Sequence, residues 1–236
     1  MAQLELHKIH ESLDKTTYRG VKMMKFPFDY LQYQMIINDV KPDLIIEIGT
    51  LMGGAALYYA DLMDTIGIEG GEVHTIDVRP VRQNFGRSVV IPSDSSIHKV
   101  VDALKNGDDV IPDMVLNHPR IKCFEDGWEN YDIGLCKGKE RVLIFDDGSH
   151  HYEAVLGALN KLSSCVTKGS YYIVEDGNVS MLFSPQKVLD SFAGGPTKAI
   201  IEFLETNDDF KIDFSKCDFF GFNSTYNTYG YLKRVK

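Results

Sequence analysis

One stretch, residues 43–58, constrains the fold more than any other part of the chain. It reads as an apolar strand that ends around Glu47, a turn at Gly49, and a helix that begins near Gly54. A strand that runs through a glycine turn into a helix typically places backbone N–H groups around a bound nucleotide. The segment therefore predicts a nucleotide-type pocket at the end of a strand in an α/β domain.

The spacing of the acid and the glycines indicates which cofactor suits this pocket. A dinucleotide fingerprint needs Gly-x-Gly-x-x-Gly around the pyrophosphate, but Leu51 stands two places after Gly49. The carboxylate of Glu47 would repel a pyrophosphate, whereas it suits a cofactor with an ammonium group. The spacing resembles the first motif of S-adenosylmethionine (SAM) dependent methyltransferases. The candidate cofactor contacts in this turn are Glu47, Gly49, Thr50, Gly53 and Gly54.

A second acid supports this interpretation. Residues 72–77 read as a short strand that ends in Asp77. In nucleotide-binding folds this position holds a ribose diol through two hydroxyl-to-carboxylate hydrogen bonds. Two strands that both end in an acid make the SAM assignment stronger. The alternative is a generic α/β domain whose glycines only permit tight turns.

Length and charge limit the classes of function. A chain of 236 residues with 44% hydrophobic residues is long enough for one core, and no linker divides it, so we expect a single domain over residues 1–236. The formal net charge of −9 argues against nucleic-acid binding, which relies on a basic surface. A small molecule is the expected partner.

The chain shows neither a membrane span nor a signal peptide. It has no run of 18 apolar residues, and its first 14 residues are polar and mixed in charge. We therefore expect a cytoplasmic protein. Its cysteines are widely spaced without a Cys-x-x-Cys pair, so we expect reduced, packed thiols at Cys123, Cys136, Cys165 and Cys217.

Strands and helices alternate along the chain. The predicted strands are 44–48, 73–76, 121–124, 141–145 and 171–174, and the predicted helices are 30–40, 54–63, 152–162 and 196–207. Residues 210–214 and 230–234 predict an antiparallel hairpin with a short connection. The order predicts a Rossmann-like, doubly wound α/β sheet closed by a C-terminal hairpin.

Two segments stand outside this alternation. Residues 1–40 predict an N-terminal arm and a helix, with residues 18–29 too irregular for a strand. Residues 79–119 contain four prolines and one plausible helix, 95–104. A connection this long in a compact domain is more often a functional lid or an oligomer contact than an idle loop. We expect a lid or interface insertion here and a homo-oligomer.

Four carboxylates follow two of the predicted strands. Asp146 and Asp147 come at the end of one strand, and Glu175 and Asp176 at the end of the next. In a doubly wound sheet these ends lie at one rim, with neighbouring strands roughly 5 Å apart. Clustered carboxylates repel one another without a cation, and oxygen ligands suit Mg²⁺, Mn²⁺ or Ca²⁺. The alternative is that the acids are solvated strand ends or helix caps.

His150 is the candidate general base. Histidine is the usual base near neutral pH, and His150 follows Asp147 by three residues on the same turn, which favours Asp147 over Asp146 as the inward-facing acid. His151 is expected to point into the following helix. The other histidines considered lack an acidic context; these are His74, His98 and His118.

Several motifs together resemble one family. They are Tyr18-Arg-Gly, Lys25-x-Pro27-x-Asp29, Lys41 to Thr50, His118-Pro-Arg-Ile121, Asp147-x-x-His150, Gly169 to Asp176 and Gly230 to Arg234. Over nearly its whole length the chain resembles the cephalosporin hydroxylase/CmcI-like methyltransferases, relatives of rhamnosyl and macrolide-sugar O-methyltransferases. The resemblance implies a class I SAM methyltransferase fold. It also implies that His150 is the base and that the metal ligands are Asp147, Glu175 and Asp176.

The chain departs from the family pattern after the strand 121–124. The family tends to have Glu-Gly-Ser-Ser there, beside the adenine, where this chain has Glu125-Asp-Gly-Trp128. We therefore expect cofactor contacts from Asp126, Gly127 and Trp128, and from Asp147 on the next strand.

The sequence thus predicts a SAM- and Mg²⁺-dependent O-methyltransferase that acts on a hydroxyl of a small molecule, a sugar or a polyketide-type secondary metabolite. One alternative is a metal-dependent hydroxylase or oxygenase with iron in the acidic site, although such enzymes typically use two histidines and one carboxylate. The other is a non-catalytic partner subunit that binds SAM without turnover.

Overall fold

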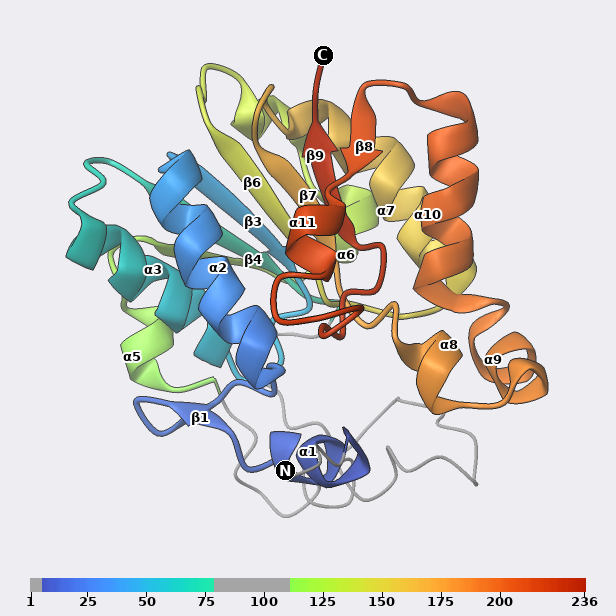
Figure 1. The fold of residues 1–236 in the computed structure, drawn as a ribbon. Coiled ribbons are helices and arrows are strands. Elements are labelled where there is room, and N and C mark those ends of the chain that lie inside the picture. Colours follow the sequence, from blue (N-terminus) through green and yellow to red (C-terminus); the bar gives the residue numbers. More distant parts are fainter. Residues whose placement is uncertain (1–5, 79–110) are drawn as a thin grey trace.

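A seven-stranded sheet lies between two layers of helices in the computed structural model, which describes residues 6–78 and 111–236 (Figure 1). The strand order is β5-β4-β3-β6-β7-β9-β8. The strands are β3 (Leu44–Ile48), β4 (Glu72–Ile76), β5 (Ile121–Phe124), β6 (Val142–Asp146), β7 (Tyr171–Val174), β8 (Phe210–Ile212) and β9 (Tyr231–Arg234). β3 to β7 are parallel, and β9 pairs antiparallel with both β7 and β8.

The main helices are α2 (Pro27–Val40), α3 (Gly54–Ile66), α7 (Tyr152–Leu162) and α10 (Gly195–Thr206). The shorter elements are α1 (Leu6–Leu13), β1 (Thr17–Tyr18), β2 (Val21–Lys22), α5 (Asp113–Leu116), α6 (Gly127–Asn130), η1 (Ile133–Cys136), η2 (Ser163–Cys165), α8 (Val179–Leu182), α9 (Pro185–Phe192) and α11 (Phe214–Cys217). The predicted α/β alternation is confirmed for these described residues.

Side chains on the central strands alternate between two cores because successive strand residues point to opposite faces. On one face, Ile45 and Phe145 pack with residues of α2 and α3. On the other, Ile46 and Ile144 pack with residues of α7 and α10. Both faces of the parallel strands are therefore buried, which explains their nearly continuous apolar sequences.

In the register of the sheet, the carboxyl ends of β3, β4, β6 and β7 lie at the same level. Ile48 of β3 lies opposite Ile76 of β4 and Asp146 of β6, and Asp146 lies opposite Val174 of β7. The residues that follow these positions therefore meet at one rim. Between β3 and β6 the chain reverses its winding direction, and ligands of open α/β sheets bind outside the carboxyl ends at such a point.

The C-terminal hairpin forms, but its connection is not the short one that we predicted. Residues 213–230 separate β8 from β9, and Phe214, predicted as strand, begins α11. This long connection is anchored in the core by Asp29. Asp29 of α2 is 1% exposed and accepts hydrogen bonds from Thr225 Oγ1, the Tyr226 backbone N–H and the Tyr231 hydroxyl.

The N-terminal arm is more ordered than its sequence suggested. Residues 17–22 form a two-stranded antiparallel hairpin, β1 and β2, within the segment that we predicted to be free of strands. α1 and β1 lie beneath the carboxyl ends of the parallel strands, on the same side as α8 (Figure 1). The arm thus comes to lie next to the rim of the sheet.

The insertion is described only at its C-terminal end. The predicted helix 95–104 lies outside the described residues. Residues 113–116 form α5, whose Val115 is fully buried in the core beside α3. Within residues 6–78 and 111–236, no helix has the length and apolar character that a membrane crossing requires.

Asp29→Ala should destabilise the fold, because it leaves three buried donors without their acceptor. Each unpaired buried group costs ~1 to 3 kcal/mol, so we expect the free energy of unfolding to fall by about 3 kcal/mol or more. Urea denaturation measures it. The matched control is Asp39→Ala at an exposed position of the same helix, which should cost little. Equal stability of the two variants would contradict this role.

Candidate active site

The turn after β3 is pressed against the turn after β6. Gly49 has φ +95°, and a Cβ atom on it would lie 2.1 Å from the carbonyl oxygen of Asp147. Only glycine fits both the positive φ and this approach. The glycine of the first motif therefore brings the acidic end of β6 next to the end of β3.

A cavity of about 450 Å³, the rim cavity, opens where these turns meet. Five of the predicted cofactor residues line it, and they follow four neighbouring strands: Gly49, Asp77, Gly127, Trp128 and Asp147. The backbone N–H of Thr50 donates to Asp77 Oδ2 at 3.2 Å and so holds that carboxylate at the cavity. These residues lie far apart in sequence, and the register of the sheet brings them to one cavity.

Glu47 and Thr50 are not part of the lining of this cavity. Glu47 is fully buried under the turn, where its Oε2 accepts a hydrogen bond from Thr75 Oγ1 at 2.6 Å. Its other oxygen, Oε1, has no partner among the described residues. Burial raises the pKa of Glu47 to about 7, although Lys25 and Thr75 oppose the shift. The Thr50 hydroxyl lies 2.6 Å from that of Thr75.

The remaining three cofactor candidates have other roles in the structure. A Cβ atom on Gly53 would lie 2.6 Å from Val115 of α5, and one on Gly54 would lie 2.2 Å from the Lys22 carbonyl oxygen. Both glycines thus let neighbouring segments pack against α3. Asp126 is exposed and precedes α6. Contacts of these residues with a cofactor remain predictions.

The acidic rim holds a cation from the protein itself. Lys25 Nζ lies 2.5 Å from Asp147 Oδ2 and 2.6 Å from Glu175 Oε1, and its side chain is 3% exposed. Burial alone would lower the pKa of Lys25, but attraction to Asp147, Glu175 and Glu47 outweighs it and the pKa is raised. The ammonium group is therefore charged at neutral pH and offsets part of the negative charge of the clustered carboxylates.

The four rim acids differ in environment. Asp146 is 4% exposed and accepts a hydrogen bond from the Tyr172 hydroxyl at 3.1 Å. Burial raises its pKa to about 7. Asp147 and Asp176 line the rim cavity, whereas Glu175 is 6% exposed and pairs with Lys25. The role of Glu175 as a metal ligand remains a prediction.

His150 belongs to the acidic cluster. Its Nε2 lies 3.1 Å from Asp176 Oδ2, and one ligand atom each from Asp147, His150 and Asp176 lie within 4.8 Å of one another. Such a mixed set of two carboxylates and an imidazole suits a divalent cation. His151 instead precedes α7 and pairs with Glu153, away from the cluster.

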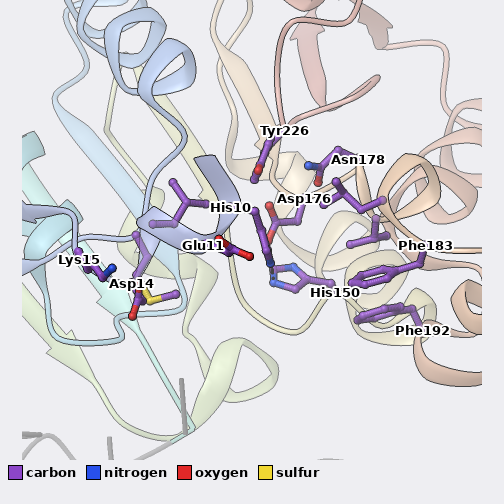
Figure 2. A pocket seen from close by; sticks show the side chains of 14 residues that line it. His10, Glu11, Asp14, Lys15, His150, Asp176, Asn178, Phe183, Phe192 and Tyr226 are labelled. Carbon is purple, nitrogen blue, oxygen red and sulfur yellow. Dashed lines mark ion pairs between the residues drawn. The ribbon is translucent and has the colours of Figure 1, made fainter. Parts of the chain in front are cut away.

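A second cavity, the acceptor cavity, also has His150 in its lining and has a volume of about 570 Å³ (Figure 2). It shares Met24, His150 and Asp176 with the rim cavity. Figure 2 shows Phe183 and Phe192 side by side on one wall. The two cavities therefore meet at the candidate base.

Three buried polar atoms of the acceptor cavity have no hydrogen-bond partner within the described part of the chain. They are Asp14 Oδ1, Asn178 Oδ1 and the Tyr226 hydroxyl. Unpaired buried polar atoms are costly, so a native site that retains them is suited to a ligand with hydroxyl groups. The stacked phenylalanines supply an apolar surface beside them.

Sequence reasoning did not assign a role to Lys25 or to these three acceptor-cavity residues. In the sequence, Lys25 is noted only as part of the Lys25-x-Pro27-x-Asp29 motif of the family resemblance. A lysine in an irregular N-terminal segment carries no local sign that it will be buried against acids more than 100 residues away. Only the fold brings α1 and the 213–230 connection to the same cavity.

Lys25→Met should destabilise the protein, because it leaves Glu175 buried without its cation. Breaking a buried ion pair in this way costs about 3 to 5 kcal/mol. We expect a loss of this size in the free energy of unfolding at neutral pH, measured by urea denaturation without divalent cations. Lys22→Met, on β2 nearby, is the matched control and should lose much less. Unchanged stability of Lys25→Met would show that the pair is not formed.

Over most of its length the chain is similar to known O-methyltransferases. The family model for rhamnosyl O-methyltransferase/CmcI matches residues 10–113 and 133–235. A rhamnosyl O-methyltransferase of Mycobacterium bovis (strain BCG / Pasteur 1173P2) is 30% identical over 223 residues, which cover 93% of this chain and 78% of that protein. One from Mycobacterium leprae (strain TN) is 29% identical and covers 93% and 83%.

Solved structures share the fold. A CmcI structure with Mg and SAM is similar over 94% of this chain and 78% of its own, with a TM-score of 0.56 and 18% identity. The O-methyltransferase NovP has a TM-score of 0.58 at 14% identity, over 91% and 82% of the two chains. The predicted class I fold and O-methyltransferase class are confirmed. The chain belongs to the rhamnosyl O-methyltransferase/CmcI family.

Proposed function

We propose that this protein transfers a methyl group from SAM to a hydroxyl of a small molecule, a sugar or a polyketide-type metabolite, with the help of a divalent cation. One observation carries the proposal: the rim cavity and the acceptor cavity meet at His150 and Asp176. A methyl donor in one and a hydroxyl in the other would face each other beside a base. The family supports the same activity.

The rim cavity suits SAM in size and in chemistry. Asp77, held by the Thr50 N–H, would accept hydrogen bonds from the ribose diol. Gly127 and Trp128 would face the adenine across the cavity. The Gly49 turn would hold the amino-acid end, above the buried Glu47 with its unpaired oxygen. In this arrangement the sulfonium methyl would face Asp147 and His150.

The divalent cation would be held by Asp147 and Asp176 at the junction of the cavities, with Glu175 as the further predicted ligand. Mg²⁺ suits these oxygen donors, as do Mn²⁺ and Ca²⁺. When bound, the cation would orient the acceptor oxygen and stabilise its developing negative charge. Lys25 would hold Glu175 in place and oppose the rise in its pKa that burial causes.

His150 would take the proton of the acceptor hydroxyl as the oxygen attacks the methyl carbon of SAM. The oxygen gains the methyl group, SAM leaves as S-adenosylhomocysteine, and the imidazole holds the proton. Asp176 would orient the ring through its 3.1 Å contact with Nε2. Most of the rate would come from positioning the two reactants in line.

The acceptor cavity favours a sugar among the two predicted acceptor classes. The unpaired oxygens of Asp14 and Asn178 would accept hydrogen bonds from hydroxyl groups of the acceptor, and the Tyr226 hydroxyl would donate or accept one. Phe183 and Phe192 would cover an apolar part of the acceptor.

The two alternatives are less well supported. Two carboxylates and one histidine lie together in the cluster, whereas iron oxygenases typically use two histidines and one carboxylate. A non-catalytic subunit would not need a base between two cavities. A turnover assay with SAM separates a methyltransferase from both.

Asp77→Ala should weaken SAM binding at least tenfold, because it removes charge-assisted hydrogen bonds worth roughly 1.5 to 3 kcal/mol each. Isothermal titration calorimetry measures the change. Asp39→Ala, at an exposed position of α2 outside the cavity lining, is the control and should bind SAM nearly as wild type. An unchanged affinity of Asp77→Ala would refute this placement of the ribose.

Exhaustive chelation should abolish methyl transfer and leave SAM binding largely intact, because the cation serves the acceptor oxygen. Added Mg²⁺ should restore turnover. Asp147→Ala and Asp176→Ala should resemble the chelated enzyme even with Mg²⁺ present. Full activity after chelation would mean that the rim acids do not hold a catalytic cation.

His150→Ala should lower turnover by about 10² to 10⁴, the range for the loss of a general base, with SAM affinity nearly unchanged. His151→Ala is the matched control and should cost far less, because His151 pairs with Glu153 outside both cavities. Single-turnover methylation across pH measures both variants. A larger loss in His151→Ala would move the role of base to that residue.

A further inference from the structure

Two cysteines lie near the amino ends of β6 and β7, at the end of the sheet opposite the candidate active site. Cys136 ends η1 before β6, and Cys165 ends η2 before β7, so both lie near the amino ends of strands whose carboxyl ends form the rim. Both side chains pack in the same apolar cluster and line the same shallow pocket. Cys165 is 8% exposed and Cys136 is partly exposed. Both thiols are free.

This pair differs from the other two cysteines. Burial raises the pKa of both Cys123 and Cys217 to about 11, so these thiols are unreactive near neutral pH. The neighbouring Cys136 thiol is the main cause that lowers the pKa of Cys165, against the effect of burial, with smaller contributions from Ser164 and Lys161. The negative charge of the pair is therefore favoured on Cys165.

The surface around the pair is cationic. Both cysteines line a shallow pocket of about 350 Å³, and its basic residues are Lys137, Lys139, Lys168 and Arg234. Lys139 pairs with Glu72 and Arg234 with Asp209, so the positive charge of the pocket comes mainly from Lys137 and Lys168. No acidic residue lines this pocket in the described part of the chain. The whole chain carries a formal charge of −9, so this concentration of positive charge is local. Clefts lined by one sign of charge attract ligands of the opposite sign.

We propose that Cys136 and Cys165 form a thiol–disulfide exchange site for an anionic low-molecular-weight disulfide. The Cys165 thiolate attacks one sulfur of the disulfide, which forms a mixed disulfide and releases one small thiolate. That thiolate takes the Cys136 proton, and the Cys136 sulfur then attacks Cys165 and releases the second small thiolate. The two protein sulfurs are oxidised to one disulfide, and the small disulfide is reduced to one thiol and one thiolate.

The new bond would join η1 to η2. The closed loop runs from residue 136 to residue 165 and includes β6 and α7. A cross-link over a loop of this length reduces the freedom of the unfolded chain, so the oxidised protein should melt at a higher temperature than the reduced protein.

The test uses the full-length protein, reduced and then treated with oxidised glutathione, a disulfide that carries carboxylates. Intact mass should show the loss of two hydrogen atoms, and peptide mapping should find Cys136 joined to Cys165. Cys136→Ser should instead accumulate one glutathionyl group on Cys165. Cys123→Ser is the matched control and should retain the Cys136–Cys165 cross-link. No cross-link, or one that involves Cys123 or Cys217, would overturn the proposal.

The charge of the pocket is tested by reversing it. In Lys137→Glu/Lys168→Glu, oxidation by oxidised glutathione should slow by about tenfold at low ionic strength, whereas oxidation by the cationic disulfide cystamine should become faster. Opposite responses to the two probes exclude a general effect on folding or on thiol exposure. Equal responses to both probes would overturn the assignment of an anionic reactant.

Discussion

The buried ammonium group of Lys25 is the interaction on which the rim of the sheet depends. It joins Asp147 after β6 to Glu175 after β7, and it belongs to the segment that precedes α2. Without it, two carboxylates at neighbouring strand ends would repel each other in a poorly hydrated place. The same contact fixes the N-terminal arm beneath the sheet, where the arm closes one side of the acceptor cavity.

The second constraint is the approach of two turns. Gly49 has no side chain, so the end of β3 reaches the carbonyl oxygen of Asp147. The register between β3 and β6 then sets how far Asp147 and His150 extend past the sheet. Because the two cavities share His150 and Asp176, the proposed methyl transfer would take place at their junction.

The central strands were predictable because their apolar runs are bounded by clear turn signals. β3, β5 and β7 begin and end where the sequence predicts, and α7 does as well. The 17–22 hairpin was missed because two-residue strands leave too short a pattern to recognise. Phe214 was predicted as strand because local alternation cannot reveal that Asp213 accepts from the Ser215 N–H at the start of α11.

The sequence by itself determined the fold class, the acids that end four strands, and the His150 that follows Asp147, because each depends on local patterns and on motif spacing. Only the tertiary structure decided which of these groups face a cavity. In the fold, Glu47 and Asp146 are buried and Glu175 pairs with Lys25. Asn178 and Tyr226 lie in one pocket. The physical reason is that burial and charge pairing arise between segments far apart in the chain, which local patterns do not encode.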